Sequence, residues 1–409
     1  MPDFEYAPEQ SRAAGQRLLA EVDDVLPLVA EHAEEAERLG RVPDAVVDAL
    51  EAAGMFRAVT PHQYGGLEVD PAAFFEAACR VASRCASTGW FASLIGIHNW
   101  QIAHLAKEAQ DEYFGPGPDT LASTSYAPTG QAESVSGGFR LSGRWDFSSG
   151  VDHAAWAILG AVIRDIEEPE FRSFVVPRRD FEIDQGSWEV TGLRGTGSKS
   201  VVLEGAFVPE HMTHRIVDVH ERNEPGMRVN DRPLFRVPWL SAFWYAIACP
   251  AIGAARGGLD AFLDINRARV AASSQRRAAG NPFLHLRLAE AHGRVDFHHA
   301  RMRQNWTEIF DAVCDAPECS RLLAKRSRYD ASNAIMDCFH ALGAVYENAG
   351  GDVIREGHPV QRFYRDLMAM TNHPAGNVDR MASLYGQELL GLPDRPFDRT
   401  QMGSLAVSS

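Results

Sequence analysis

Cysteine is scarce in this chain of 409 residues, which contains only six. Six cysteines are too few for a disulfide scaffold at this length, and none forms a CxxC pair or stands beside histidines at zinc-ligand spacing. The first ten residues, MPDFEYAPEQ, lack the basic segment and apolar run of a secretory signal. We therefore expect reduced thiols, no metal site and a cytoplasmic protein.

Positive charge is also in deficit, because 40 Lys and Arg residues face 55 Asp and Glu residues and leave a net charge of -15. Such a chain repels phosphate backbones and anionic bilayers, so neither nucleic acid nor a membrane is expected as a partner. The most apolar window, residues 87–106, has the length of a membrane span but contains His98, Asn99, Gln101 and His104. It predicts a buried helix.

The motifs of several common enzyme classes are missing. The sequence has no GxGxxG between a strand and a helix and no GxxxxGK[ST], which excludes the usual dinucleotide and P-loop sites. It has no HExxH, no paired ExxH helices and no GxSxG, which excludes the corresponding zinc, di-iron and serine-hydrolase sites. A redox enzyme with this sequence must receive its electrons from another protein.

Hydrophobic residues recur at helical spacing from about residue 11 to residue 106. Helix starts are marked by Pro43 and by Asp70 with Pro71, and Gly54 marks a stop. These signals predict a helical N-terminal domain over residues 1–118.

The hydrophobic pattern then changes twice along the chain. Residues 121–209 break into short alternating or β-rich runs separated by Gly, Pro and Asp, which predict an antiparallel β domain within 119–215. Helical spacing returns after a polar connector and predicts a helical C-terminal domain over 216–409. Its expected helices are 241–272, 282–313, 319–349, 359–372 and 377–390.

Six local segments stand in a characteristic order along this helical, β, helical arrangement. They are 87–90 (STGW) with 96–100 (GIHNW), 123–128 (STSYAP), 145–150 (WDFSSG), 192–198 (GLRGTGS) and 362–366 (RFYRD). In this order and spacing the chain resembles the acyl-CoA dehydrogenase superfamily. More narrowly, it is similar to the oxygenase components of two-component, group D flavin-dependent monooxygenases that hydroxylate hydroxyphenylacetate or phenolic secosteroids. The resemblance implies an α+β fold with an N-terminal α-helical domain, a central antiparallel β-barrel and a C-terminal four-helix bundle.

The resemblance also separates the dehydrogenase branch from the hydroxylase branch. Dehydrogenases of this fold carry a glutamate base after the Arg-Asp pair, whereas residues 371–375 here read TNHPA. An alternative base position falls in 239–244 (WLSAFW), which contains no acid. Without a carboxylate base, α,β-desaturation loses its first step. A histidine at this place implies hydroxylation of a phenolic or polycyclic aromatic by O2 and reduced flavin, through a C4a-hydroperoxyflavin.

The resemblance implies the catalytic residues. His373, with His98 as its companion, would activate the ring by deprotonating or hydrogen-bonding its hydroxyl group, because imidazole titrates near operating pH. A hydroxyl from the β domain would protect the oxygenated flavin at N5, and both Ser148 and Ser149 match this position. The turn is one residue shorter than in the dehydrogenases, so both serines stay candidates.

The resemblance further implies a flavin site and a substrate pocket. Arg269 would contact the flavin phosphate, and Gly350 with Gly351 would let a neighbouring subunit approach the cofactor. Glu347 replaces the glutamine of dehydrogenases and disfavours a permanently bound FAD, so we expect an exchangeable FADH2 or FMNH2. The remaining candidates for flavin contacts are Trp90, Ser123 and Ser125, and those for substrate contacts are Thr124 and Trp244.

The same resemblance implies two kinds of protein partner and leaves three other functions open. A separate NAD(P)H-dependent flavin reductase would supply reduced flavin, and a homotetramer is expected because the cofactor of this fold lies between subunits. Three other functions share the fold: N-oxygenation of an amine, an acyl-CoA dehydrogenase or oxidase with a relocated base, and a flavin-binding subunit without catalysis.

Overall fold

The computed structural model describes residues 8–269 and 278–405. Its N-terminal part is helical, as predicted. Asp70 Oδ1 accepts a hydrogen bond from the backbone N–H of Ala72 (2.8 Å) at the start of the fourth helix, and Gly54 ends the third with a φ of +84°. The helices are α1 (Pro8–Glu31), α2 (Ala33–Leu39), α3 (Asp44–Ala52), α4 (Pro71–Arg84), α5 (Ala86–Ile102) and α6 (Lys107–Phe114).

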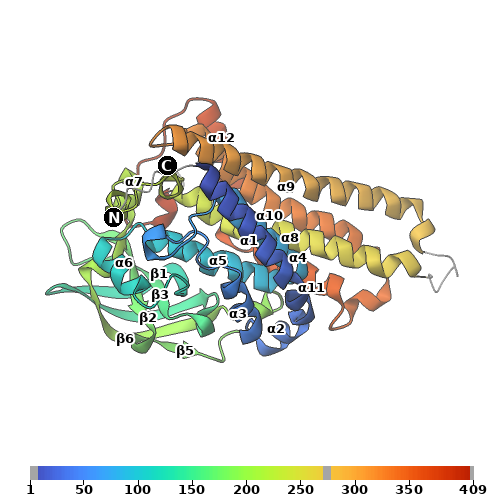
Figure 1. Ribbon diagram of the computed structural model, residues 1–409, viewed down its shortest axis with the longest axis horizontal. Coiled ribbons are helices and arrows are strands. Elements are labelled where there is room, and N and C mark those ends of the chain that lie inside the picture. Colours follow the sequence, from blue (N-terminus) through green and yellow to red (C-terminus); the bar gives the residue numbers. More distant parts are fainter. Residues whose placement is uncertain (1–7, 270–277, 406–409) are drawn as a thin grey trace.

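Helix α5 is the centre of the molecule. It lies between the β-sheet and the long C-terminal helices (Figure 1) and is buried along its whole length except at Leu94. Glycines allow this close packing: a Cβ at Gly89 would lie 2.3 Å from Ala82, and one at Gly96 would lie 2.7 Å from Phe74. The predicted buried helix is confirmed.

The β domain is a seven-stranded sheet in the order β5-β6-β2-β1-β3-β4-β7. Its strands are β1 (Ala122–Val135), β2 (Gly138–Ser148), β3 (Trp156–Ile163), β4 (Glu170–Pro177), β5 (Glu182–Asp184), β6 (Lys199–Pro209) and β7 (Thr213–Arg215). Strands β1 and β2 form an antiparallel hairpin, whereas β3 crosses to the other side of β1 and pairs with it in parallel.

The predicted antiparallel β-barrel is therefore wrong on two points. The sheet contains one parallel pair, and it is open, with β5 and β7 at its edges. Both edge strands have three residues, too few to form a closing ladder, and each pairs with a single neighbour among the described strands. Alternating hydrophobicity identified the strands but contains no information about which strands pair.

The C-terminal part is helical again, and the predicted helices are confirmed within a few residues. They are α8 (Trp239–Ala268), α9 (Pro282–Asp315), α10 (Arg321–Tyr346), α11 (Pro359–Thr371) and α12 (Val378–Leu389), and a short helix that was not predicted, α7 (Ile216–Glu221), precedes them. Residues 270–272 of the expected helix 241–272 lie outside the described residues. Helices α8, α9 and α10 run side by side, and α11 packs on α8 and α10 (Figure 1).

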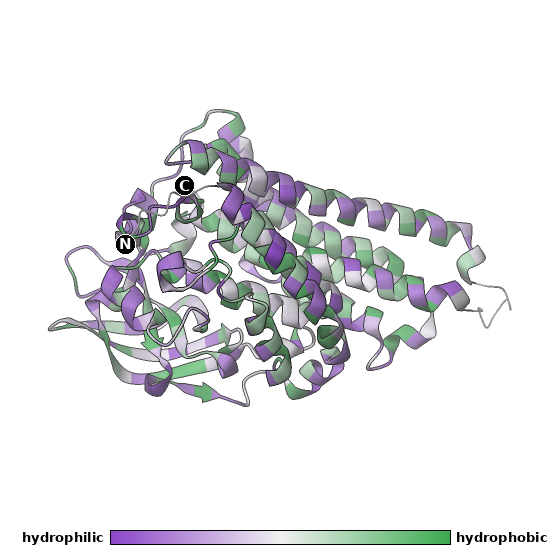
Figure 2. Cartoon of the chain, in the orientation of Figure 1, coloured by the Kyte–Doolittle hydropathy of each residue, from purple (hydrophilic) through white to green (hydrophobic). Residues whose placement is uncertain are grey.

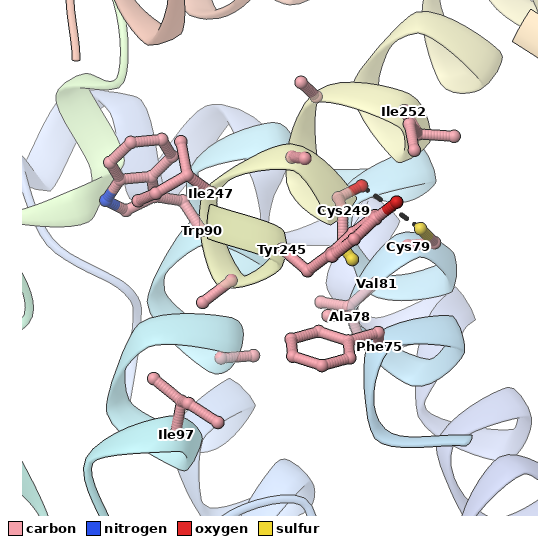
Figure 3. Close-up of a cluster of buried hydrophobic side chains, with 14 of the residues drawn as sticks. Phe75, Ala78, Cys79, Val81, Trp90, Ile97, Tyr245, Ile247, Cys249 and Ile252 are labelled. Carbon is pink, nitrogen blue, oxygen red and sulfur yellow. Dashed lines mark hydrogen bonds between the residues drawn. The ribbon is translucent and has the colours of Figure 1, made fainter. Parts of the chain in front are cut away.

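Helix α8 forms the core of this part. By length and composition it could cross a membrane, but 78% of its most apolar window is buried inside the protein. Tyr245 and Cys249 point toward Phe75 and Cys79 of α4, whereas Ile247 points to the other side of α8 (Figure 3). The thiol of Cys79 lies 3.2 Å from the carbonyl oxygen of Cys249. Hydropathy colouring shows hydrophilic residues along much of α9, on the outside of the helices (Figure 2).

Asp366 joins three parts of the fold. Its carboxylate, on α11, accepts hydrogen bonds from the backbone N–H of Leu193 (2.6 Å) and from Ser87 Oγ on α5 (3.4 Å). Leu193 has a φ of +57°, so the turn that presents its N–H is strained. Burial raises the pKa of Asp366 to about 6.

This raised pKa predicts a pH-dependent stability difference. Folded Asp366 keeps its proton up to about pH 6, whereas the unfolded carboxyl loses it near its ordinary value, so this residue's stabilisation is largest below about pH 4 and is lost as pH rises to 6. Asp366→Asn cannot ionise, and its amide can accept from Leu193 and donate to Ser87. We expect its melting temperature relative to the natural protein to rise between pH 4.5 and 6.5. Parallel melting curves across this range would contradict the assignment.

Candidate active site

Trp90, Ser149 and His373 come together from three separate segments. Trp90 lies on α5, Ser149 follows β2, and His373 lies between α11 and α12. The indole N–H of Trp90 donates to Ser149 Oγ (3.1 Å), and the rings of Trp90 and His373 meet edge to face with centroids 5.8 Å apart. This trio is the first part of the candidate site.

His98 forms the second part, two helical turns farther along α5, about 12 Å along the axis. Its Nδ1 lies 2.7 Å from the carbonyl oxygen of Ala122 and must donate to it. Its Nε2 therefore accepts in the neutral form, and Thr124 Oγ1 lies 3.0 Å away as the donor. Burial lowers the pKa of His98 to about 4, so the ring is neutral at pH 7.

His373 has the opposite hydrogen-bonding arrangement. Its Nδ1 accepts from the backbone N–H of Ala375 (3.1 Å), where the imidazole caps a short 3-10 turn. The neutral ring therefore carries its proton on Nε2 and presents a donor there. Surrounding protein lowers the pKa of His373, although the residue keeps an accessible face.

The two candidate serines point to different partners. Ser148 donates to Ser123 Oγ (3.0 Å). Ser123 and Thr124 are adjacent on β1 and point to opposite faces, so Ser148 lies on the face turned away from His98. Ser149 contacts Trp90 and lies 2.8 Å from Ser198 Oγ. The structure therefore brings Ser149, and not Ser148, into the trio with His373.

An irregularity of β2 at Phe147 sets the directions in which Ser148 and Ser149 point. Phe147 has a φ of +63° and is 72% exposed, and the β2–β6 pairing shifts register between Trp145 and Ser148. The irregularity breaks the strand alternation, which is why the sequence could not assign the two serines.

The other predicted residues are distributed as follows. Arg269 donates to the carbonyl oxygens of Asn348 (3.3 Å) and Ala349, and a Cβ at Gly350 would lie 2.5 Å from its guanidinium. Gly351 follows directly. Ser125 donates to the Asp146 carbonyl (2.7 Å). Trp244 donates to Ser332 on α10 (3.2 Å).

Two polar residues near His98 were not among the predicted site residues. Gln101 follows His98 by one helical turn on α5, and Tyr126 follows Thr124 by two positions on β1, so both spacings could have identified them. The hydroxyl of Tyr126 donates to Gln101 Oε1. Two aromatic rings of α8 also lie beside His98. The ring of Phe243 stacks on that of His98 with centroids 6.3 Å apart, and the ring of Trp239 stacks on that of Phe243 with centroids 4.2 Å apart.

The low pKa of His98 predicts a flat pH profile. If neutral Nε2 must accept the hydrogen bond of Thr124, activity should persist as pH falls through 6.5 and should decline only near the folded pKa of about 4. The measurement is the rate of a single turnover with pre-reduced flavin between pH 5 and 8. A decline of activity centred near pH 6.5 would show that an unburied histidine controls the reaction.

Comparison with known proteins identifies relatives over nearly the whole chain. Residues 16–117 match the acyl-CoA dehydrogenase N-terminal domain and residues 245–377 the C-terminal domain. The chain is 37% identical to the flavin-dependent monooxygenase oxygenase subunit HsaA of Rhodococcus jostii, covering 91% of this chain and 98% of that protein. It is 33% identical to the FADH2-dependent resorcinol hydroxylase oxygenase component of a Rhizobium strain, covering 96% and 98%.

A solved structure of a similar protein has the same fold. The crystal structure of 3-HSA hydroxylase from Rhodococcus sp. RHA1 superposes with a TM-score of 0.88 at 36% identity, covering 93% of this chain and 98% of that one.

Proposed function

The chain belongs to the oxygenase components of two-component flavin-dependent monooxygenases, on the acyl-CoA dehydrogenase fold, and on this premise we propose that its substrate is a phenolic or polycyclic aromatic. The enzyme is a hydroxylase that uses O2 and reduced flavin, and a separate reductase supplies the flavin. The observation that carries the choice of a phenol is the His98–Thr124 pair, in which a neutral imidazole accepts from a hydroxyl group.

Reduced flavin, once bound, supplies with O2 the electrophilic oxygen atom that is inserted into the ring. The chain's residues fit this cofactor: Arg269 offers positive charge beside Gly350, where any side chain would fill the space. We assign Ser149 to flavin N5, because it lies with Trp90 and His373. Ser148, Ser123 and Ser125 support this segment through the sheet.

We assign His98 and His373 different roles in binding and activating the substrate. His98 Nε2 stays neutral and accepts the hydrogen bond of Thr124, which leaves Thr124 Oγ1 as an acceptor for the substrate hydroxyl and makes the ring more electron-rich. His373 presents its Nε2–H at the Trp90–Ser149 end of the site, where it is placed to hydrogen-bond to an oxygen atom of the substrate and stabilise negative charge. From the sequence, His373 could either deprotonate the substrate hydroxyl or hydrogen-bond to it. Only the hydrogen bond is compatible with an Nδ1 that accepts from the Ala375 N–H, because the ring proton is then on Nε2.

Neither alternative reaction is favoured by the site. An acyl-CoA dehydrogenase needs a carboxylate at the substrate, whereas the groups described around Trp90 and His98 are hydroxyls, amides, indoles and imidazoles. N-oxygenation of an amine uses the same cofactor but does not need the hydrogen-bond acceptor that the Thr124–His98 pair offers to a hydroxyl group.

The test is reconstitution with a generic flavin reductase. The purified chain should not oxidise NADH, and it should hydroxylate phenols when the reductase supplies FADH2 or FMNH2. Mixing the reduced flavin complex with O2 should produce a transient absorbance between the reduced and oxidised flavin bands. NADH oxidation by the chain alone, or conversion of amines but not phenols, would overturn the proposal.

We also propose a cytoplasmic homotetramer built through a four-helix bundle of α8, α9, α10 and α11. Helix α9 carries three exposed apolar side chains on one face, at Phe283 (73%), Leu286 (61%) and Phe297 (59%), which supports a partner there. Light scattering should give the mass of four chains. An active monomer would refute this assembly.

A further inference from the structure

A row of three hydroxyl groups leads from Ser149 into the protein, and we call it the hydroxyl row (Ser149, Ser198, Thr196). Ser149 Oγ lies 2.8 Å from Ser198 Oγ, and Ser198 Oγ lies 2.6 Å from Thr196 Oγ1. Thr196 Oγ1 lies 2.8 Å from the backbone carbonyl oxygen of Leu193, where the row ends. All three hydroxyl-bearing residues are buried, so each of these oxygen–oxygen contacts needs a proton between its two atoms.

The carbonyl group at the end fixes the direction of every hydrogen bond in the row. A carbonyl oxygen can only accept, so Thr196 must donate its hydroxyl proton to Leu193. Thr196 then has no second proton for Ser198, and Ser198 must donate to Thr196. By the same step, Ser149 must donate to Ser198. The single hydroxyl proton of Ser149 is therefore directed to Ser198.

Backbone hydrogen bonds hold the row in place. The N–H of Leu193 donates to a carboxyl oxygen of Asp366 on α11 (2.6 Å), and the N–H of Thr196 donates to the Leu193 carbonyl (3.1 Å). The carbonyl of Thr196 accepts from the N–H of Gly150, in the segment that follows β2 (2.9 Å). The two segments that carry the hydroxyl row are thus tied to each other, which keeps its contacts short.

The oxygen of Ser149 keeps one lone pair for a ligand. Within the described part of the chain its hydrogen-bond partners are Ser198, to which it donates, and the indole N–H of Trp90, from which it accepts (3.1 Å). A hydroxyl oxygen can accept two hydrogen bonds and donate one. Ser149 can therefore bind one more group, and that group must be a donor.

This restriction distinguishes the two redox states of a flavin. Reduced flavin carries a hydrogen atom on N5, whereas N5 of oxidised flavin has a lone pair and no hydrogen. An oxygen that can only accept forms a hydrogen bond with the N5–H of reduced flavin. Beside oxidised flavin, the same oxygen places its lone pair against that of N5.

We propose that Ser198 and Thr196 are positioning residues that fix the Ser149 hydroxyl as a hydrogen-bond acceptor toward flavin N5. Neither residue needs to touch the flavin, because both act through the direction of the Ser149 proton. This inference rests on the proposed placement of Ser149 at N5 and adds the groups that set its direction.

The test measures the dissociation constants of oxidised and of reduced flavin for the whole protein. FMN and FAD are each titrated in the oxidised form and, after reduction with dithionite, in the absence of O2. The natural protein should bind the reduced form at least about tenfold more tightly, as one hydrogen bond would give. Binding is measured without turnover, so this readout is separate from hydroxylation.

Thr196→Val keeps the shape of the side chain and removes the acceptor of the Ser198 proton. Ser198 can then donate to Ser149, and Ser149 can donate to N5 of oxidised flavin. We expect the preference for reduced flavin to fall about tenfold, with oxidised flavin bound more tightly than by the natural protein. Thr196→Ser is the matched control, because it keeps the hydroxyl and should keep the preference.

Ser198→Ala gives a second route to the same result and serves if Thr196→Val does not fold. It removes the acceptor of the Ser149 proton, which can then turn to N5. This variant should also bind oxidised flavin more tightly than the natural protein does. Loss of structure alone would weaken the binding of both redox forms and would not strengthen either.

Ser149→Ala separates the inference from the proposed placement. Equal affinities for both forms in the natural protein, a preference that survives in the folded Thr196→Val or Ser198→Ala variant, or equal weakening of both forms would overturn the inference. A changed preference in Ser149→Ala would still uphold Ser149 at N5. An unchanged preference in Ser149→Ala would overturn that placement and the inference with it, while hydroxylation of 4-methylphenol with supplied reduced flavin would still uphold the function.

Discussion

Replacing His373 by alanine should lower the rate of ring hydroxylation by about 10²–10⁴-fold, the usual effect of losing a residue that handles a proton or a developing charge. Flavin binding and its reaction with O2 should continue, because Ser149 and Trp90 remain in place. Peroxide should then be released instead of hydroxylated product. The measurement is the ratio of hydroxylated product to H2O2 with reduced flavin, O2 and a phenol in excess.

His373 also caps the turn Pro374–Gly376 through its Nδ1, so the alanine variant loses structure as well as chemistry. His373→Asn separates the two, because an asparagine oxygen can accept from Ala375 N–H while the imidazole is gone. We expect the asparagine variant to be as inactive as the alanine variant. Recovery of hydroxylation in His373→Asn would show that the residue serves only the backbone turn.

Ser149→Ala should release peroxide before any substrate is engaged. Loss of the hydroxyl removes the proposed contact with flavin N5 and leaves the Trp90 N–H without its acceptor. One lost hydrogen bond of about 1–3 kcal/mol corresponds to a roughly 5–150-fold shorter lifetime of the transient absorbance. The measurement is the decay of that absorbance after mixing reduced enzyme with O2 in the absence of substrate.

Ser148→Ala is the matched variant, since it removes the same group one residue earlier. Its hydroxyl bonds to Ser123 within the sheet, so we expect a loss of stability of about 1 kcal/mol and little change in the decay. If Ser148→Ala shortens the lifetime and Ser149→Ala does not, the assignment of the serines to flavin N5 is reversed.

Local sequence signals predicted the helices well, because their causes are local. Asp70 with Pro71 started α4, and the nearly continuous apolar composition of 87–106 placed α5 at the centre. The sheet was predicted less well. Its strands were visible as alternating runs, but the parallel pairing of β1 with β3 joins residues far apart in the chain, and no local spacing specifies such a pair.

The candidate site shows the same division. The sequence by itself determined the helical and β segments, the absence of a carboxylate at residues 371–375, and the residues His98, Thr124 and His373 as candidates. Only the tertiary structure decided which serine joins Trp90, which nitrogen of each histidine carries the proton, and in which direction the hydroxyl of Ser149 donates. These properties depend on hydrogen-bond partners from other segments, so they exist only after the chain has packed.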